Sequence, residues 1–267
     1  MNFFQRFLPG NAVAFLLAAA LYFSLDGLSQ TAQSPLPELR PPQSGYQFLV
    51  RETLNYAVDW RVFPAGTASI HLEQQGNTEK IDATGESIGA VSLLFRVSDK
   101  FQSSFDRRTG CSAGFSRQLI EGRRQVNSDL QFDNGQHKAT YQEKNLVSGI
   151  SKHEEWNIPG CVTELLSAIF YGASQPIAVG QSFEMPLADA QHVVAVTMKA
   201  EGRETIKTPA GTYQTIRVQP TADAGVVKNR GEMWVWYTDD ARHLPVQMRA
   251  RLFWGTLTMR LSGIEQK

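Results

Sequence analysis

The sequence has no excess of charge of either sign, because 26 lysine and arginine residues are matched by 26 aspartate and glutamate residues. Binding to a nucleic-acid backbone requires a positively charged face on the protein. The two arginine pairs, at 107–108 and 123–124, each have an acidic neighbour, and we interpret them as solvated strand ends. We therefore expect no nucleic-acid partner.

The sequence also lacks the short motifs of the common enzyme classes. Neither glycine-rich phosphate-binding pattern occurs, and none of the five histidines has the spacing of a zinc-binding helix. The nearest approach to a G-x-S-x-G nucleophile elbow, at 172–176, ends in proline. We predict a protein without enzymatic activity, cofactor or metal. The alternative is an enzyme that uses dispersed carboxylates such as Asp59, Asp99 and Asp240.

Cysteine is scarce, with only Cys111 and Cys161 in the chain. In an exported protein an even pair indicates a disulfide. Closing a loop of this length would stabilise the fold by about 4 kcal/mol in the chain-entropy model. The alternative is two buried free thiols, while a two-cysteine metal site would need further ligands that the neighbouring sequence does not offer.

No long hydrophobic run occurs either. The longest, at 13–23, is shorter than the ~20 residues that a comfortable transmembrane helix needs. It follows Arg6 and precedes small residues at 27–29, the pattern of an export signal over 1–29. We expect a periplasmic or secreted protein. The alternative is an uncleaved N-terminal anchor in the inner membrane, the one membrane contact that the sequence predicts. No cysteine near this segment offers a lipid attachment site.

The stretch 30–46 holds four prolines among serine, glutamine and threonine, which is typical of an extended linker. We expect a single folded domain over 47–267. Its 42% hydrophobic and 10% aromatic residues, counted over the whole chain, suffice for a core.

Apolar and polar residues alternate with a period of two through most of this domain, as at 54–60, which predicts β-strands. Glycine-containing turns separate them, and Asn134-Gly135 is a strong hairpin signal. The expected fold class is mainly β, with a large curved antiparallel sheet or an open half-barrel.

Two segments depart from this alternation. The stretch 161–171 carries apolar residues at the i, i+3, i+4, i+7 spacing, which predicts one principal helix packed on the concave face of the sheet. The apolar stretch 89–95 is short, and we predict a helical turn or a strand edge that covers the core.

A run of aromatic residues on one predicted strand and the apolar stripe of the helix together predict either a filled core or an apolar pocket. Aromatic side chains that alternate along a strand share one face. The candidate pocket residues are Trp60, Leu165, Leu166, Ile169, Phe170, Trp234, Trp236 and Trp254.

Several motifs occur in a recognisable order: 54–60 (LNYAVDW), 159–171 (PGCVTELLSAIFY), 208–213 (TPAGTY), 233–240 (MWVWYTDD) and 243–246 (HLPV). In this order they resemble the bacterial exported family called domain of unknown function 3108, over about 51–264. The resemblance implies a periplasmic or secreted β-domain, and we expect an open, curved sheet similar to the half-barrels of lipoprotein carriers. It implies no established activity and no catalytic residues. The arginine expected shortly after the helix is missing, since 172–174 reads Gly-Ala-Ser.

The leading hypothesis is a non-enzymatic domain that binds a hydrophobic, lipid-like ligand or another envelope component. The alternative is a structural or assembly factor of the cell envelope that acts through protein contacts at a sheet edge or surface patch.

Overall fold

The computed structural model describes residues 36–188, 192–223, 231–252 and 255–266. All described residues belong to one compact unit, within Pro35–Lys267. The predicted export signal therefore lies outside the described residues. Among these residues, no helix is long and apolar enough to span a membrane.

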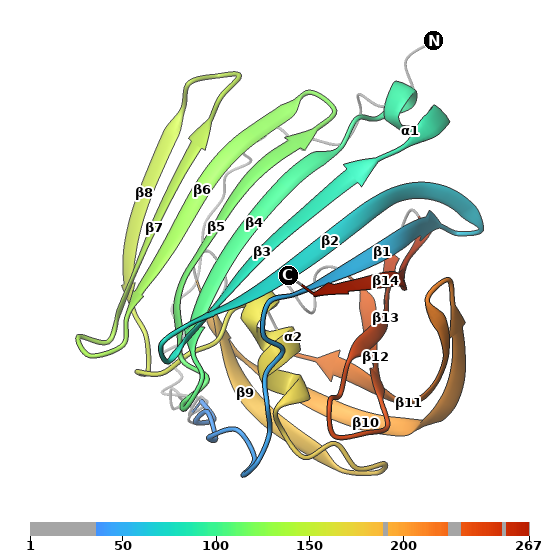
Figure 1. The fold of residues 1–267 in the computed structure, drawn as a ribbon. Helices are drawn as coiled ribbons and strands as arrows, with labels where there is room; N and C mark the ends of the chain where they lie inside the picture. Colours follow the sequence, from blue (N-terminus) through green and yellow to red (C-terminus); the bar gives the residue numbers. More distant parts are fainter. Residues whose placement is uncertain (1–35, 189–191, 224–230, 253–254, 267) are drawn as a thin grey trace, which may run out of the picture. The chain divides into compact units, whose positions relative to one another are not determined.

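Strands dominate the described residues, with two short helices, α1 (Gly89–Leu94) and α2 (Leu165–Ala173) (Figure 1). The strands are β1 (Glu52–Trp60), β2 (Phe63–Gln75), β3 (Thr78–Ser87), β4 (Ser98–Asp106), β5 (Ser112–Glu121), β6 (Arg124–Asp133), β7 (Lys138–Asn145), β8 (Ser151–Asn157), β9 (Ser182–Ala188), β10 (Val193–Thr208), β11 (Gly211–Thr221), β12 (Glu232–Thr238), β13 (Pro245–Leu252) and β14 (Gly255–Gln266).

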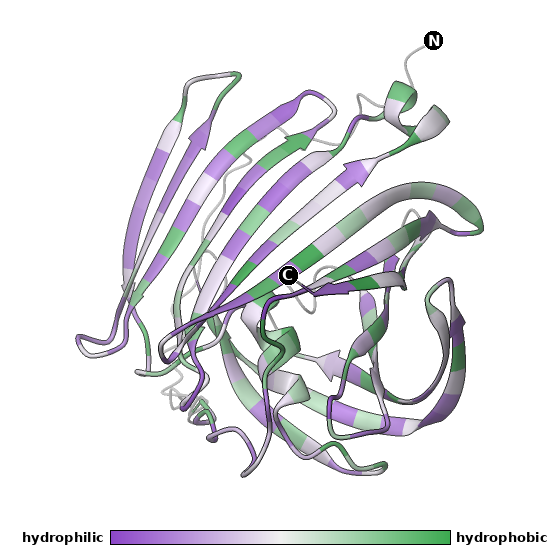
Figure 2. Ribbon diagram, in the orientation of Figure 1, coloured by the Kyte–Doolittle hydropathy of each residue, from purple (hydrophilic) through white to green (hydrophobic). Residues whose placement is uncertain are grey.

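All these strands form one antiparallel sheet of 14 strands, in the order β8-β7-β6-β5-β4-β3-β2-β1-β14-β13-β12-β11-β10-β9. Neighbours in the sheet are neighbours in the chain, except where β1 pairs with β14. The sheet is not closed, so β8 and β9 are its edges. The mainly β fold class predicted from the period-two alternation is confirmed, and Figure 2 shows the alternating polar and apolar bands along the strands.

Helix α2 begins four residues later than the sequence pattern predicted. Thr163 forms an isolated bridge with Leu187, so the chain is still extended there. Glu164 then caps the helix, because its side chain accepts hydrogen bonds from the backbone N–H groups of Leu166 and Ser167. This satisfies donors that have no partner within the first turn.

The helix is the centre of the core. Leu166 and Phe170 belong to one buried cluster with residues of β1 to β4, such as Leu54 and Phe105. Ala168, Tyr171 and Ala173 belong to a second cluster with residues of β9 to β12. Figure 1 shows α2 between these two groups of strands. The helix therefore joins two halves of an open sheet into one core.

Residues 36–46, which form most of the predicted linker, pack along α2. The backbone N–H of Gln43 donates to the carbonyl of Ser174 at 2.9 Å, and that of Arg40 donates to the hydroxyl of Tyr171 at 3.0 Å. The compact unit begins at Pro35 rather than near residue 47. Extended, proline-rich chain makes few hydrogen bonds within itself, so its ordering here depends on partners from the helix.

The disulfide prediction is confirmed. Cys111 and Cys161 are bonded, with a Cα–Cα distance of 5.0 Å and a sequence separation of 50. The bond joins the turn after β4 to the segment that enters α2. The bond therefore holds the segment that leads into α2 against the sheet.

Candidate functional site

The space beside α2, where a ligand pocket was one of two expectations, is filled by side chains. Leu166 and Phe170 are buried against Leu54, Ile81 and Phe105 from three different strands. The other half of the helix is buried equally well against β9 to β12. Among the described residues, this region is therefore a packed core rather than an open pocket.

The predicted pocket residues do not all come together. Trp60 lies at the end of β1 and is exposed, and Leu165 is the one apolar position at the start of α2 that faces solvent. Ile169 packs against the core clusters and is only partly buried. Trp254 lies outside the described residues.

The two tryptophans of β12 lie on the strand face opposite Tyr237, and Trp236 is buried in the cluster that also contains Leu166 and Phe170. The indole N–H of Trp236 donates to Glu204 at 2.9 Å, and the guanidinium groups of Arg249 and Arg251 lie 5.2 and 5.4 Å from the ring centres of Trp236 and Trp234. The next residue, Tyr237, donates its hydroxyl to a backbone carbonyl of α2 at 2.8 Å. Because successive side chains of a strand point to opposite faces, the tryptophans share a face as expected, and Tyr237 on the other face contacts the helix.

A buried acid and two serines meet at the start of α2. One carboxylate oxygen of Glu164 accepts from the hydroxyl of Ser103 at 2.5 Å and from the N–H of Ser167 at 2.7 Å, while the other accepts from the N–H of Leu166 at 2.9 Å. Burial raises the pKa of Glu164, and these hydrogen bonds oppose that rise. Both oxygens are engaged in capping the helix, so the arrangement serves the fold.

The dispersed carboxylates of the alternative enzyme hypothesis are each held by a separate partner. Asp59 forms an ion pair with Arg260 at 2.6 Å. Asp99 accepts from the N–H of Ile120 at 3.0 Å. Asp240 accepts from Thr238 in the β12–β13 turn at 2.8 Å. Each interaction accounts for the position of its carboxylate within the fold.

A further buried acid, Glu79 on β3, has one charged neighbour among the described residues, Arg107. Its carboxylate is fully buried and lies 3.4 Å from the Nε atom of Arg107, and it accepts no hydrogen bond from the described residues. Arg107 in turn lies over the ring of Phe48, which follows residues 36–46 in the chain. Burial raises the pKa of Glu79 to about 7, although Arg107 opposes the rise.

The free energy of unfolding is expected to fall as the pH rises from about 4.5 to about 7. Over this window the folded protein keeps the proton of Glu79 that the unfolded chain has lost, so the contribution is complete below the lower value and lost above the higher. Burial also raises the pKa of Asp99, to about 6, and acts in the same direction. We expect a loss of about 2 kcal/mol in urea unfolding between about pH 5 and about pH 8.

The control for this prediction is Glu79→Gln, which keeps the size of the side chain and removes its titration. In each protein we compare the free energy of unfolding at the two pH values. The loss of the charged partner of Arg107 lowers the stability of the variant at both pH values, so this loss cancels in the difference. A variant whose stability changes with pH as much as that of the natural chain would contradict the assignment.

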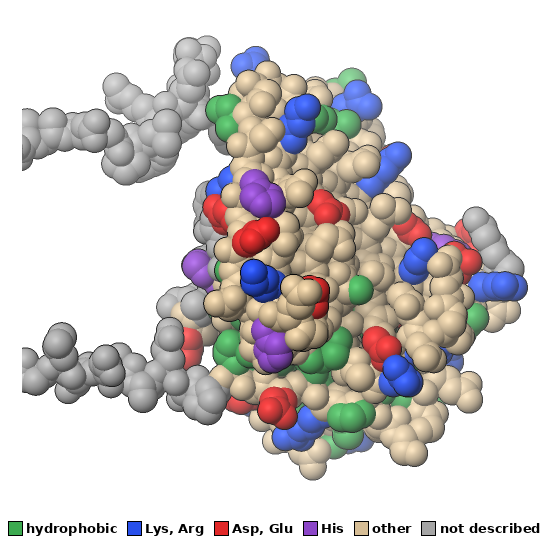
Figure 3. Space-filling view, turned by 90° about the vertical axis from the view of Figure 1, so that its left-hand side faces the viewer, with side chains coloured by type: hydrophobic (Ala, Val, Ile, Leu, Met, Phe, Trp, Pro, Cys, Tyr) green, Lys and Arg blue, Asp and Glu red, His purple; other side chains and the backbone are tan. Residues whose placement is uncertain are grey.

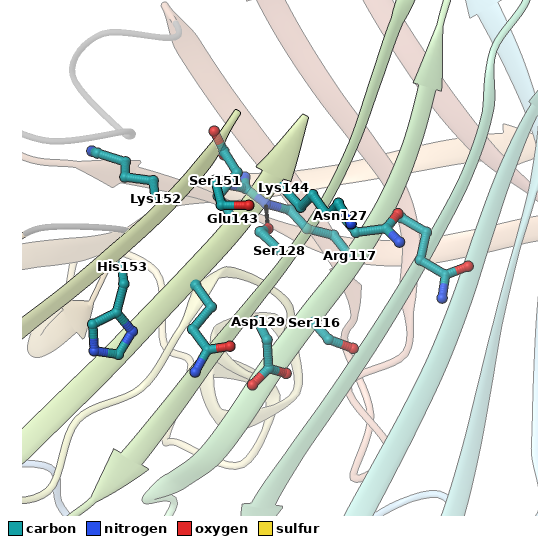
Figure 4. Close-up of a pocket in the computed structure, with 12 residues that line it drawn as sticks. Ser116, Arg117, Asn127, Ser128, Asp129, Glu143, Lys144, Ser151, Lys152 and His153 are labelled. Atoms are coloured by element: carbon teal, nitrogen blue, oxygen red, sulfur yellow. Dashed lines mark hydrogen bonds between the residues drawn. The ribbon is translucent and has the colours of Figure 1, made fainter. Parts of the chain in front are cut away.

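A polar surface groove with a volume of about 540 Å³ lies over strands β5 to β8 (Figure 4). Two rows of side chains that cross the strands form its sides: Gln118, Asn127, Lys144 and Ser151 in one row, and Ser116, Asp129, Gln142 and His153 in the other.

The row between these two turns its side chains to the opposite face. There Arg117 donates to the hydroxyls of Ser128 and Tyr141, and Tyr141 is part of a buried cluster. Residues of this middle row, Arg117, Ser128, Glu143 and Lys152, also line the groove. Figure 3 shows polar and charged side chains dispersed over the side of β7 and β8, as expected for a solvated face.

A different surface stands out by its apolar character. Strands β1 to β8 form the part of the sheet that we call the wing. Ten of the fourteen large hydrophobic side chains that are exposed among the described residues lie at three turns of this wing. We call them the apolar rim: Trp60, Val62, Phe63, Ile88, Leu93, Leu94, Phe95, Leu146, Val147 and Ile150.

The topology places these turns at one end of the wing. In a sequential antiparallel meander, the turns after β1, β3, β5 and β7 share one end, and the turns after β2, β4 and β6 share the other. The backbone connects the successive turns of the rim end: Ile88 donates to Ala65, and Gly122 donates to Arg96. Figure 1 shows α1 and the β7–β8 turn at this end.

Helix α1 belongs to the apolar rim, and its expected role is corrected. The segment was predicted to cover the core, but none of the helix residues is buried. Leu93 and Leu94 are 88% and 87% exposed. The short helix extends beyond the ends of β3 and β4, where no described strand lies opposite it. The hydrophobic content of the segment alone indicated burial. The segment lies outside the core because β3 and β4 end before it.

The model of a family described as "Protein of unknown function (DUF3108)" matches residues 55–262. No curated protein matches the chain. A solved beta-barrel-like protein of the domain of unknown function DUF1849, from Brucella abortus, shares the fold at a TM-score of 0.53. Its sequence identity is 11%, and the match covers 82% of this chain and 98% of that chain.

Two further solved structures match over similar lengths. A protein of Bacteroides fragilis that is proposed to be exported, with a YmcC-like fold, is 9% identical, at a TM-score of 0.37, with 83% of this chain and 98% of that chain covered. A proposed lipoprotein of Parabacteroides distasonis is 8% identical, at a TM-score of 0.35, with 82% and 97% covered.

Proposed function

The chain belongs to the DUF3108 family of proteins of unknown function, and we propose that it is an exported, non-enzymatic protein that binds a hydrophobic component of the cell envelope. The apolar rim is the binding surface in this proposal. A lipid or the lipid-bearing part of an envelope protein is the class of ligand.

The disulfide supports the location. Disulfides form and persist outside the cytoplasm, where thiols are not kept reduced. Cys111 and Cys161 are bonded, and the disulfide fixes the entry to the central helix, so the fold benefits from an oxidising compartment. The predicted export signal at 1–29 agrees with this location.

The concentration of exposed apolar side chains at one end of the wing carries the proposal. Soluble proteins rarely expose clustered large hydrophobic residues unless these residues contact a partner or a lipid phase. In the described chain the turns at the opposite end of the wing expose no large hydrophobic residue. Because the space beside α2 is filled, a hydrophobic ligand would bind at the surface.

Crosslinking in living cells tests this function. A photoreactive amino acid replaces Leu94 in the full chain, and the peptide that carries it is analysed by mass spectrometry after illumination. We expect adducts of lipid or of a lipid-bearing envelope protein. Leu94 is almost fully exposed, so the replacement should not disturb the fold.

The matched control replaces Val179, an exposed apolar residue in the connection between α2 and β9. Equal labelling at both positions would contradict the proposal, because the rim would then have no special environment. Adducts only with a protein that carries no lipid would favour the assembly-factor alternative.

A further inference from the structure

The rim combines its apolar side chains with positive charge. The four turns at this end of the wing contain Arg61, Arg96, Arg123 and Arg124, and their only acid is Glu121. Glu121 forms an ion pair with Arg124. The chain as a whole is neutral, so this end of the wing carries more positive charge than the rest of the chain. In Figure 3 the upper end of the visible side carries Lys or Arg and hydrophobic side chains, and the acidic side chains lie lower.

The two kinds of side chain alternate within the turns. Arg61 lies over the ring of Trp60 at 5.4 Å, and Val62 and Phe63 follow directly. Leu93, Leu94 and Phe95 of the next turn precede Arg96 in the same way. Arginine can keep its guanidinium in water or among head groups while its stem lies on apolar surface, and tryptophan prefers the same boundary.

The spacing of the turns indicates which kind of partner can bind the apolar rim. They are separated by about two strand spacings each, so the rim extends roughly 30 Å from the β1–β2 turn to the β7–β8 turn. A single lipid molecule cannot contact apolar side chains spread over this length. A bilayer surface can, because it is continuous and fluid and receives each turn independently. The excess of arginine complements anionic lipid head groups.

We propose that the apolar rim docks the protein on an anionic phospholipid bilayer, with the hydrophobic side chains of the turns inserted among the head groups. This inference rests on the proposed function, of which it specifies the partner. Insertion of exposed turns reaches about 5–10 Å into the boundary between head groups and acyl chains. The groups that insert are Leu93, Leu94, Val147 and Ile150, and the arginines provide the preference for anionic lipid.

The test uses an environment-sensitive dye on the full chain. Both natural cysteines are in the disulfide, so a thiol introduced by Leu94→Cys is the one available for labelling. The labelled protein is mixed with vesicles of phosphatidylglycerol and phosphatidylcholine, or of phosphatidylcholine alone. We expect a blue shift with the anionic vesicles that salt weakens. The same dye at Val179→Cys should not shift. This comparison reports on the rim itself, even if the N-terminal segment also binds lipid.

A second pair of variants tests the charge. Arg96→Gln with Arg123→Gln should weaken the vesicle affinity of the dye response roughly 25-fold, since each arginine near an anionic surface contributes about fivefold. The control is Arg108→Gln, an exposed arginine in the β4–β5 turn at the opposite end of the wing. It should leave the affinity unchanged.

Equal dye responses at Leu94→Cys and Val179→Cys would overturn the docking surface. A blue shift that depends on protein concentration without vesicles would also overturn it and assign the rim to a contact between copies of the chain. If crosslinking from Leu94 still yielded lipid adducts in cells while vesicles gave no response, the proposed function would stand and the bilayer would be the wrong partner.

Discussion

Leu166→Asp is expected to lower the free energy of unfolding by more than about 4 kcal/mol, enough to unfold most small domains. Leu166 is 9% exposed and lies in the buried cluster that joins α2 to β1 through β4. A carboxylate there would have to be buried without a partner or remain in water by separating the helix from the sheet. Urea unfolding followed by circular dichroism measures the loss.

The preceding residue provides the control. Leu165 is 41% exposed on the same helix, so Leu165→Asp places an identical charge one position away, where water can solvate it. It also places an acid in the first turn of the helix, where the dipole favours negative charge. We expect a change within about 0.5 kcal/mol for this surface position. Equal losses in the two variants would show that α2 is not oriented as described.

Removal of the disulfide is expected to have the second-largest effect. Cys111→Ser together with Cys161→Ser should lower the free energy of unfolding by about 4 kcal/mol, because the bond closes a loop of about 50 residues in the unfolded chain. The bond also fixes the segment that leads into the cap residue Glu164. We therefore expect the loss to be accompanied by earlier exposure of α2 to hydrogen exchange.

Reduction of the natural chain is the control for this prediction, since it breaks the same bond without changing a residue. The reduced protein and the double variant should unfold at similar urea concentrations. If reduction left the transition of the natural chain where it was, the bond would not contribute to stability and the loop-closure explanation would be wrong.

The location of the apolar rim could not be predicted from local sequence. Residues 89–95 have the composition of a core segment, and 146–150 contains three apolar residues without alternation. Whether such residues are buried depends on how far the strands on either side extend and on what lies opposite.

The face of β12 that meets the helix was equally undetermined. Period-two alternation showed that Trp234 and Trp236 share a face, and it does not distinguish the two faces when both are apolar. The choice is made by Tyr237, which hydrogen-bonds to α2, and by the acid and arginines that accompany the tryptophans. These partners come from elements far away in the sequence.

The sequence by itself determined the strand-rich class, the existence of one principal helix, the pairing of the two cysteines and the family. Each depends on local periodicity, on an order of motifs or on there being a single possible pair. Tertiary structure alone decided where α2 begins and that residues 36–46 pack along it. It also decided that side chains fill the space beside α2 and that ten hydrophobic side chains are exposed at one end of the wing. The physical reason is that burial and backbone hydrogen bonding depend on partners from distant parts of the chain, which the sheet brings together by pairing β1 with β14.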